Sequence, residues 1–269
     1  MNSSHEVDLR NKLLDRLNAG EVVGIMSVRL SRGVEIASLV QAAGFEALYV
    51  DMEHSTASAD DASRICIACL GAGITPLVRV PVIDEAHVSR LLDAGAMGII
   101  GPHVHDAAQA RRLVELCKFP PLGQRSSVAW LPQLGYRPAK LQHITTVMNK
   151  ATAVVVMIED QQALANVDEI AAVEGVDILF IGSNDLSADL GITGQDGHAL
   201  LDSAVASVID ACRRHGKVAG IGGLARQPAL LQRYVDMGAR FVSMGTDLSF
   251  LFEGARQQAD IVRKLAKES

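Results

Sequence analysis

The chain has no block of basic residues, no long apolar run and few cysteines. Its 31 acidic and 25 basic side chains give a formal net charge of -6, which offers nucleic acid no electrostatic footprint. No uninterrupted stretch of roughly 18 apolar residues occurs, so a typical membrane-spanning helix is excluded. Residues 1–6 lack the basic and apolar parts of a signal sequence. We therefore expect a cytoplasmic protein with neither a nucleic acid nor a membrane partner.

The four cysteines do not form a zinc-binding set. Cys66 and Cys69 have the C-x-x-C spacing, but they lie in an apolar helical stretch, and no second pair or nearby histidine completes a site. We interpret them as reduced thiols that pack in the core as small apolar groups.

The chain does have a regular alternation of apolar runs and amphipathic segments. Its 269 residues, 49% of them hydrophobic, match one α/β barrel or two smaller domains, and we expect one domain over residues 1–269. Eight short, β-rich apolar runs recur, at 22–28, 47–53, 75–80, 98–103, 153–159, 177–181, 217–221 and 240–244.

Amphipathic segments separate these runs, at 33–43, 60–71, 84–94, 107–118, 200–215 and 228–237. Several end in a glycine of the kind that caps helices: Gly44, Gly95, Gly216 and Gly238. Strict alternation with continuous apolar strands indicates a parallel sheet covered by helices, and eight units favour closure into a (β/α)8 TIM barrel. An open, doubly wound sheet is the alternative.

Two segments fall outside the repeat. Residues 8–19 are expected to form a helix that caps the bottom of the barrel. The connection 119–150, about thirty residues long, contains Arg125 and the only tryptophan, Trp130. Connections of this length inside a domain are often functional, so we expect a lid or a binding loop.

Active sites of such barrels form where strands end, so the last residues of each strand are the informative ones. The predicted strands end in titratable or polar groups: Arg29, Asp51, Glu53, His54, Arg79, His103, Glu159, Gly182 to Asp185, and Gly245 to Asp247. Buried carboxylates are costly unless paired, so this ring of acids, arginines and histidines indicates a site at one mouth of the barrel.

Glu159 and Asp185 follow consecutive strands and are candidate metal ligands. Two carboxylates, with water at the remaining positions, suit a hard octahedral ion such as Mg²⁺ or Mn²⁺. The alternative is that Asp185 caps the helix after Gly182 while Glu159 pairs with an arginine.

Arg79 and His54 are the other candidates at this mouth. A guanidinium there would grip a carboxylate with two hydrogen bonds, or else would be a buried counter-ion for Asp51 or Glu53. A histidine beside acids suits a general base near neutral pH, although a lone histidine is more often structural.

Several motifs in order resemble the HpcH/HpaI aldolase family of metal-dependent class II pyruvate aldolases. They are Asp51-x-Glu53-His54, Leu77-Val78-Arg79, Pro120-Pro121-x-Gly123-x-Arg125, Ile158-Glu159 and Phe180-Ile181-Gly182-x-x-Asp185-Leu186-Ser187. The resemblance runs from about Leu9 to Phe250. Where relatives often carry a glutamine two residues before the metal-binding glutamate, this chain has Met157.

The resemblance implies a role for each matching residue. Glu159 and Asp185 would ligate a divalent metal, Mg²⁺ or Mn²⁺ with Co²⁺ as an alternative, which also chelates a pyruvate-like donor. Arg79 would hold the keto or enolate oxygen, and His54 would act as the base. The family pairs this base with an aspartate that matches Asp93, which the predicted topology puts at the wrong end of its own barrel. It would reach a site only in a neighbouring subunit, or would be structural.

The remaining candidates concern substrate binding. The small residues Gly182, Ser183 and Asn184 would let the donor approach the backbone, and Asp51 and Glu53 would orient water or the base. Arg29, with Arg79 and Arg125, would give the pocket three guanidiniums, which favours a di- or tricarboxylate substrate. The alternative for Arg29 is a surface salt bridge.

The resemblance thus predicts a lyase that reversibly cleaves a 4-hydroxy-2-oxo acid to pyruvate and an aldehyde through a metal-bound enolate. The first alternative is an enolate condensation, such as citrate-synthase-like chemistry in siderophore assembly. The second is a non-catalytic carboxylate-binding barrel. Members of the family exchange their last helix and form hexamers, so residues 248–267 are a candidate for the exchanged helix of a homo-oligomer.

Overall fold

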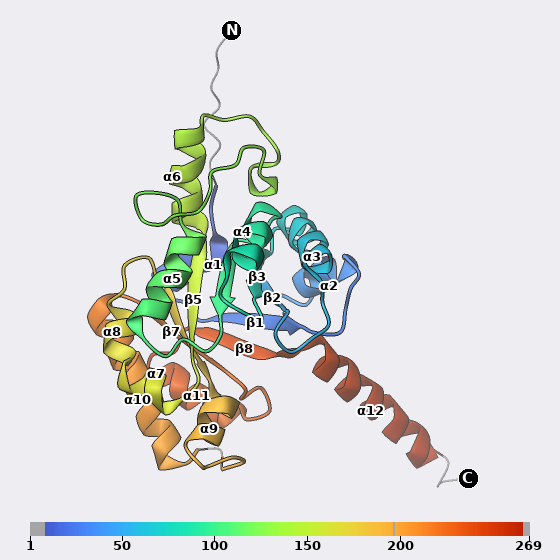
Figure 1. Cartoon of the computed structure of the whole chain (residues 1–269). Helices are drawn as coiled ribbons and strands as arrows, with labels where there is room; N and C mark the ends of the chain where they lie inside the picture. Colours follow the sequence, from blue (N-terminus) through green and yellow to red (C-terminus); the bar gives the residue numbers. More distant parts are fainter. Residues whose placement is uncertain (1–8, 196, 266–269) are drawn as a thin grey trace.

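Eight parallel strands close into one barrel in chain order in the computed structural model, which describes residues 9–195 and 197–265 (Figure 1). The strands are β1 (Val23–Val28), β2 (Ala47–Asp51), β3 (Thr75–Arg79), β4 (Gly98–Gly101), β5 (Ala153–Ile158), β6 (Ile178–Gly182), β7 (Val218–Gly222) and β8 (Phe241–Thr246). All eight predicted runs are strands, so the expected TIM barrel is confirmed and the open sheet is wrong.

Helices follow the strands and cover the outside of the barrel. They are α2 (Glu35–Ala42), α3 (Ala59–Ala72), α4 (Glu85–Asp93), α5 (Ala107–Cys117), α7 (Gln161–Ala165), α8 (Val167–Ala171), α9 (Ser183–Asp189), α10 (Ala199–His215) and α11 (Pro228–Met237). The last helix, α12 (Asp247–Leu265), follows β8 but does not cover the barrel. The glycines predicted as caps have positive φ, for example Gly216 at 64° directly after α10. Cys66 and Cys69 are buried in α3, as expected.

Alternate residues of each strand face the barrel interior. Tyr49, Leu77, Met157 and Phe180 belong to the inner cluster, whereas their strand neighbours pack under the helices. Strand periodicity of two then carries Asp51, Arg79 and Glu159 inward at the carboxyl ends, two residues beyond Tyr49, Leu77 and Met157. Asp51 and Arg79 are also register partners between β2 and β3. The strands therefore deliver these three side chains to one place.

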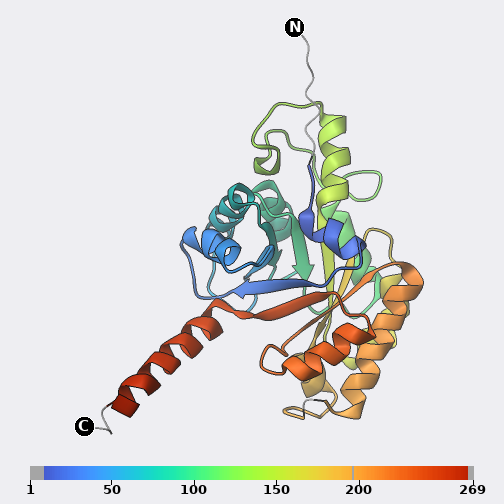
Figure 2. The same cartoon turned by 180° about the vertical axis from the view of Figure 1, so that it is seen from behind.

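Helix α1 (Lys12–Asn18) closes the amino-terminal end of the barrel, as predicted, and lies against the strands in Figure 2. Leu13 and Leu17 are buried in the same cluster as the barrel interior. Asn11 caps the helix and donates to the carbonyls of Met97 and Ala151, close to the starts of β4 and β5. The predicted start of this helix, at residue 8, lies outside the described residues.

The connection 119–150 is not a lid over the mouth of its own barrel. It contains the short 3-10 helix η1 (Pro132–Leu134) and helix α6 (Leu141–Ala151), and it leads into the amino-terminal end of β5, opposite the mouth. Its own small apolar cluster fixes it there, centred on Phe119, Ile144 and Met148. A chain-length argument alone cannot tell the two ends of a barrel apart, which is why the prediction of a lid was wrong for its own barrel, while the alternative of a binding loop stays a prediction.

Helix α12 projects away from the barrel in both views (Figures 1 and 2). Only Asp247, its first residue, is buried. Its exposed apolar side chains are Leu248, Phe250, Leu251, Phe252, Ile261, Val262 and Leu265. Residues 266 and 267 of the predicted helix lie outside the described part. Across the helices that the structure describes, none has both the length and the apolar character needed to cross a bilayer.

Candidate active site

A cavity of about 260 Å³ opens at the carboxyl ends of the strands. It brings together predicted site residues from the ends of four strands, β1, β2, β3 and β6. Its lining residues are Arg29, Tyr49, His54, Arg79, Met157, Phe180, Gly182, Ser183, Asn184, Asp185, Gly222, Gly223 and Ser243.

Arg79 is held at the floor of this site by two carboxylates. Its Nε donates to Asp51 Oδ1 at 2.9 Å and its Nη2 to Asp51 Oδ2 at 2.6 Å, a bidentate pair with both side chains buried. Its Nη1 lies 2.8 Å from Glu53 Oε2. Burial alone would lower the pKa of Arg79, but the hydrogen bond and charge of Asp51 raise it. The guanidinium is therefore fixed and permanently charged.

Asp51 also organises its surroundings. Its Oδ2 accepts a second hydrogen bond from Arg29 Nε at 2.6 Å, and its Oδ1 accepts the backbone N–H groups of Glu53 and His54 at 3.2 Å. Burial would raise the pKa of Asp51, but the hydrogen bonds and charge of Arg79 lower it. Asp51 thus orients the arginines and the loop that carries His54 and is saturated with partners.

His103, which sequence reasoning placed at a strand end without assigning it a role, connects the arginine to Glu159. Its Nε2 lies 2.7 Å from Glu53 Oε1, and its Nδ1 and backbone N lie 3.3 and 3.1 Å from Glu159 Oε2. Its φ of 53° is unusual for a residue other than glycine. Such a conformation persists when surrounding contacts fix it, and here Glu159 supplies them.

Glu159 is buried with little compensation for its charge. Burial raises the pKa of this carboxyl, the N–H and charge of His103 oppose the rise, and the nearby charges of Glu53 and Asp185 reinforce it. A Cβ placed on Gly182 would lie only 2.9 Å from Glu159 Cγ, so the end of β6 packs directly on this side chain. Glu159 and the start of the loop to Asp185 are therefore neighbours.

His54 and Asp185 lie at the more open part of the cavity. The His54 side chain is 50% exposed, and its Nε2 is 3.8 Å from Glu53 Oε2. That exposure leaves the imidazole free to exchange protons with substrate or water. Gly182, Ser183 and Asn184 form the wall between Asp185 and the strands, and Ser183 Oγ is anchored by the carbonyl of Gly222 at 2.6 Å.

Met157 stands in the cavity where relatives often have glutamine. Its Sδ lies 3.7 Å from Arg79 Nη1, a weak sulfur contact in place of an amide contact. One face of the arginine is therefore less firmly bonded than an amide would make it.

Asp51, Glu53 and Glu159 contact residues that line the cavity without lining it themselves, whereas two predicted residues lie away from it in their own chain. Arg125 is buried and its Nη2 donates to Asp93 Oδ1 at 2.7 Å, at the end of α4. The Arg125 guanidinium also stacks over Phe119, 4.6 Å from the ring centroid. Within one subunit the three-guanidinium pocket is thus a two-guanidinium pocket, formed by Arg29 and Arg79.

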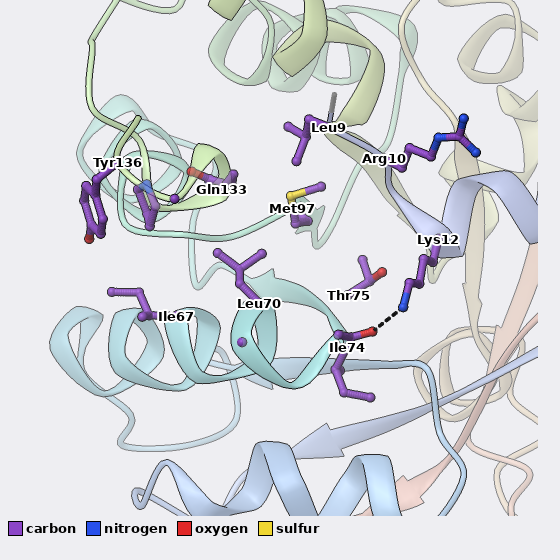
Figure 3. A pocket seen from close by; sticks show the side chains of 14 residues that line it. Leu9, Arg10, Lys12, Ile67, Leu70, Ile74, Thr75, Met97, Gln133 and Tyr136 are labelled. Atoms are coloured by element: carbon purple, nitrogen blue, oxygen red, sulfur yellow. Dashed lines mark hydrogen bonds between the residues drawn. The ribbon is translucent and has the colours of Figure 1, made fainter. Parts of the chain in front are cut away.

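A larger cavity, of about 520 Å³, lies at the other end of the barrel beside α1 and α3 (Figure 3). Its walls include Leu9, Leu70, Ile74 and Met97, and none of its lining residues in the described chain is an acid or a histidine. Size alone would favour this cavity over the one at the mouth. Chemistry selects the mouth, where acids, arginines and a histidine converge.

A sequence model of the HpcH/HpaI aldolase/citrate lyase family matches residues 30–253. The chain belongs to this family. It is 42% identical to 4-hydroxy-4-methyl-2-oxoglutarate aldolase of Hapsidospora irregularis over 262 residues, which cover 96% of this chain and 97% of the relative. The family and its relatives make this chain an aldolase, a carbon–carbon lyase.

Solved structures agree with this assignment. The HpcH/HpaI aldolase of Desulfitobacterium hafniense superposes with a TM-score of 0.89 at 30% identity, with 95% of this chain and 97% of that chain covered. A citrate synthase, SbnG, superposes with a TM-score of 0.83 at 26% identity, covering 95% and 98% of the two chains.

Proposed function

We propose that the chain cleaves a 4-hydroxy-2-oxo acid reversibly into pyruvate and a carbonyl compound, with a divalent metal held by Glu159 and Asp185. The observation that carries the proposal is the fixed Arg79 guanidinium in the same cavity as His54 and Asp185, with the buried Glu159 beside it. Breaking a carbon–carbon bond next to a ketone generates an enolate, and a positioned cation stabilises its oxygen without a covalent intermediate.

The residues present fit a divalent cation. Asp51, Glu53, Glu159 and Asp185 carry four negative charges against two positive charges on Arg29 and Arg79, and Glu159 has a raised pKa because its burial is not compensated. No group of three or more His, Cys, Asp or Glu side chains suited to a metal occurs among residues 9–195 and 197–265. Two carboxylates plus substrate and water oxygens suit Mg²⁺ or Mn²⁺, with Co²⁺ as an alternative. The metal, when bound, supplies Lewis acidity at the keto oxygen.

Arg79 and His54 divide the remaining work. The Nε and Nη2 of Arg79 donate to Asp51, Nη1 lies near Glu53 Oε2 and Met157 Sδ, and the guanidinium lines the cavity with one N–H of Nη2 not used by Asp51. Arg79 therefore stabilises the developing enolate oxygen. His54, half-exposed at the rim, takes the proton of the 4-hydroxyl directly or through a water in cleavage, and returns it in condensation. Gly182 to Asn184 seat the pyruvate portion.

We propose a dicarboxylate as the substrate class, with Arg29 holding the second carboxylate. Arg29 contacts Asp51 through Nε alone, and among the described residues neither of its Nη atoms has a hydrogen-bond partner. An unused pair of Nη donors suits a bidentate carboxylate. The relatives named for 4-hydroxy-4-methyl-2-oxoglutarate and 4-hydroxy-2-oxo-heptane-1,7-dioate both act on dicarboxylates, which supports this choice.

A second candidate is condensation of an enolate with a ketone acid, and the structural similarity to the citrate synthase SbnG favours testing it. Both reactions need the same arginine and the same carboxylates. The direction of the reaction and the acceptor distinguish them.

We also propose a homo-oligomer, a hexamer by family resemblance, in which α12 packs on a neighbour. A cavity of about 700 Å³, lined mostly by apolar residues such as Ile36, Leu39 and Phe45, adjoins the start of α12 and is suited to an apolar helix. An exposed helix with seven large apolar side chains requires a covering surface in water. In such an assembly Asp93, and Arg125 with it, would reach a neighbour's mouth.

Release of pyruvate from a panel of 4-hydroxy-2-oxo acids, coupled to lactate dehydrogenase and run with and without EDTA, tests the proposal. We expect release that EDTA abolishes and Mg²⁺ or Mn²⁺ restores. Metal-independent release would contradict the metal-dependent mechanism. Release from no donor, with condensation of oxaloacetate and an acetyl donor instead, would favour the second candidate.

A further inference from the structure

The loop after β1 is held by a carboxylate from the other end of the chain. Asp247 Oδ1 accepts the backbone N–H of Arg29 at 2.8 Å, Oδ2 accepts that of Ser31 at 2.7 Å, and the N–H of Leu30 lies 3.2 and 3.1 Å from the two oxygens. Three consecutive N–H groups around one carboxylate form an anion-binding arrangement. Here the anion is part of the chain itself.

These hydrogen bonds from the loop to Asp247 fix the backbone of Arg29, which lies beyond the last residue paired in the sheet. Strand β1 ends at Val28, whose register partner is Val50, so no ladder extends to Arg29. The carbonyl side of the loop is held separately, because Arg32 Nη1 donates to Arg29 O at 3.0 Å. The N–H groups of the loop therefore depend on Asp247.

Asp247 is built to keep its charge. Its side chain is buried, and burial alone would raise its pKa, but the N–H groups of Arg29, Ser31 and Leu30 lower the pKa below its ordinary value. The carboxylate is ionised at neutral pH, where the hydrogen bonds from the loop are charge-assisted and strong.

Asp247 is also the first residue of α12, the helix that projects from the barrel. One side chain thus joins the start of this helix to the arginine that faces the cavity. Neither the motifs that carry the family resemblance nor the candidate ring assigned it this task.

We propose that Asp247 is a positioning residue: it fixes the loop at Arg29 to Ser31 and so aims the Arg29 guanidinium at the second carboxylate of the substrate. This role rests on the function proposed above. It makes dicarboxylate selectivity depend on the first turn of α12, while the pyruvate portion of the site, built on Arg79 and Asp185, does not depend on it.

Binding of two matched probes in the presence of Mn²⁺, measured by isothermal titration calorimetry, tests this role. The probes are 2-oxoglutarate and 2-oxopentanoate, which have the same chain length and differ only in the terminal carboxylate. We expect Asp247→Asn to weaken 2-oxoglutarate binding roughly tenfold or more, the effect of one lost charge-assisted contact, and to change 2-oxopentanoate binding less than about twofold.

Asp106→Asn is the matched control. Asp106 caps α5 at the same end of the barrel by accepting the N–H of Gln109 at 2.8 Å, and it does not contact the β1 loop. We expect both probes to bind this variant as they bind the wild-type protein. If Asp247→Asn does not fold, Asp247→Glu, which keeps the charge but moves the carboxylate, takes its place.

A double-mutant cycle separates positioning from a general structural effect. If Asp247 acts through Arg29, adding Asp247→Asn to Arg29→Ala costs no further 2-oxoglutarate affinity. An additive loss, an equal loss for both probes, or a wild-type protein that does not prefer 2-oxoglutarate would each overturn the positioning role. A protein that prefers 2-oxoglutarate through Asp247 but cleaves no donor would instead overturn the proposed function and leave this role supported.

Discussion

Arg125 donates to Asp93 at 2.7 Å at the end of α4, and no other described residue forms an ion pair with either of them. The Arg125 side chain is fully buried while that of Asp93 is 40% exposed, so the carboxylate faces outward on a rigid support. An outward carboxylate on such a support suits a role in a neighbouring subunit.

Asp93→Asn should therefore lower kcat by at least about tenfold, and it should also lower the melting temperature, because it leaves the buried Arg125 guanidinium without its ion-pair partner. Mixed oligomers give the sharper measurement. Subunits with Asp93→Asn and subunits with His54→Ala should recover part of the activity when dissociated and reassembled together.

The control mixture combines His54→Ala with Arg79→Lys, two changes within the same cavity. Every site in this mixture carries one of the two changes, so reassembly should recover no activity beyond that of the separate variants. If the Asp93 and His54 mixture recovers no more activity than either variant alone, Asp93 is structural.

Asp51 offers a test of the arginine support. Asp51→Asn leaves the guanidinium of Arg79 buried without its main counter-ion, and removing one partner of a buried pair costs about 3–5 kcal/mol of stability. We expect a clearly lower midpoint in urea unfolding and a loss of kcat of roughly 10²-fold or more. Asp61→Asn, at the exposed capping box of α3, is the control and should lower the free energy of unfolding by no more than about 2 kcal/mol.

The metal should bind more weakly as the pH falls. The weakening should begin at a higher pH than it would for a metal site built on an ordinary glutamate. Burial raises the pKa of Glu159, so protons compete with the metal from a pH above the ordinary value of 4.5. In the absence of metal, the protonated Glu159 contributes to the free energy of unfolding at low pH. This contribution is lost as the pH rises through the raised pKa.

Thermal unfolding with Mn²⁺ or EDTA between pH 5 and pH 8 measures this effect. The stabilisation by Mn²⁺ should grow as pH rises, and Glu159→Gln should remove both the stabilisation and its pH dependence. A Glu159→Gln variant that Mn²⁺ still stabilises as the wild type would show that the cation binds elsewhere.

Much of the fold could be predicted because the strands of a parallel barrel are buried on both faces. The resulting continuous apolar runs, such as the one ending at Val28, stand out, and their number implies closure. The same burial hides which residues face inward. Leu77 and Val78 look alike in sequence, yet only Leu77 faces the interior with Arg79 above it.

The strand-end residues of the site were predictable for a related reason, since a polar group after an apolar run marks the mouth. Arg125 follows a helix instead, and its position depends on how residues 119–150 pack, which no local pattern encodes. His103 was visible as a strand end, but its contacts with Glu53 and Glu159 depend on a φ of 53° that sequence does not reveal.

If α12 packs on a neighbouring subunit, a charge placed on its apolar face should weaken the oligomer. Val262 is 64% exposed and apolar, so Val262→Asp together with Ile261→Asp should shift the protein toward smaller species in size-exclusion chromatography with light scattering. Gln257→Asp, a charge on the same exposed helix at a polar position, should leave the assembly unchanged. Equal behaviour of the two variants would mean that this face makes no subunit contact.

Helix α1 gives the barrel a closed floor. Leu13 and Leu17 pack at the end where the strands begin, so the described cavity opens at the mouth and not through the floor. When a reaction forms two products in a cavity with one opening, the products leave in a fixed order. For the proposed cleavage we expect the fragment nearer the rim to leave first, and pyruvate, seated deeper, to leave last and to compete with the next substrate for its place.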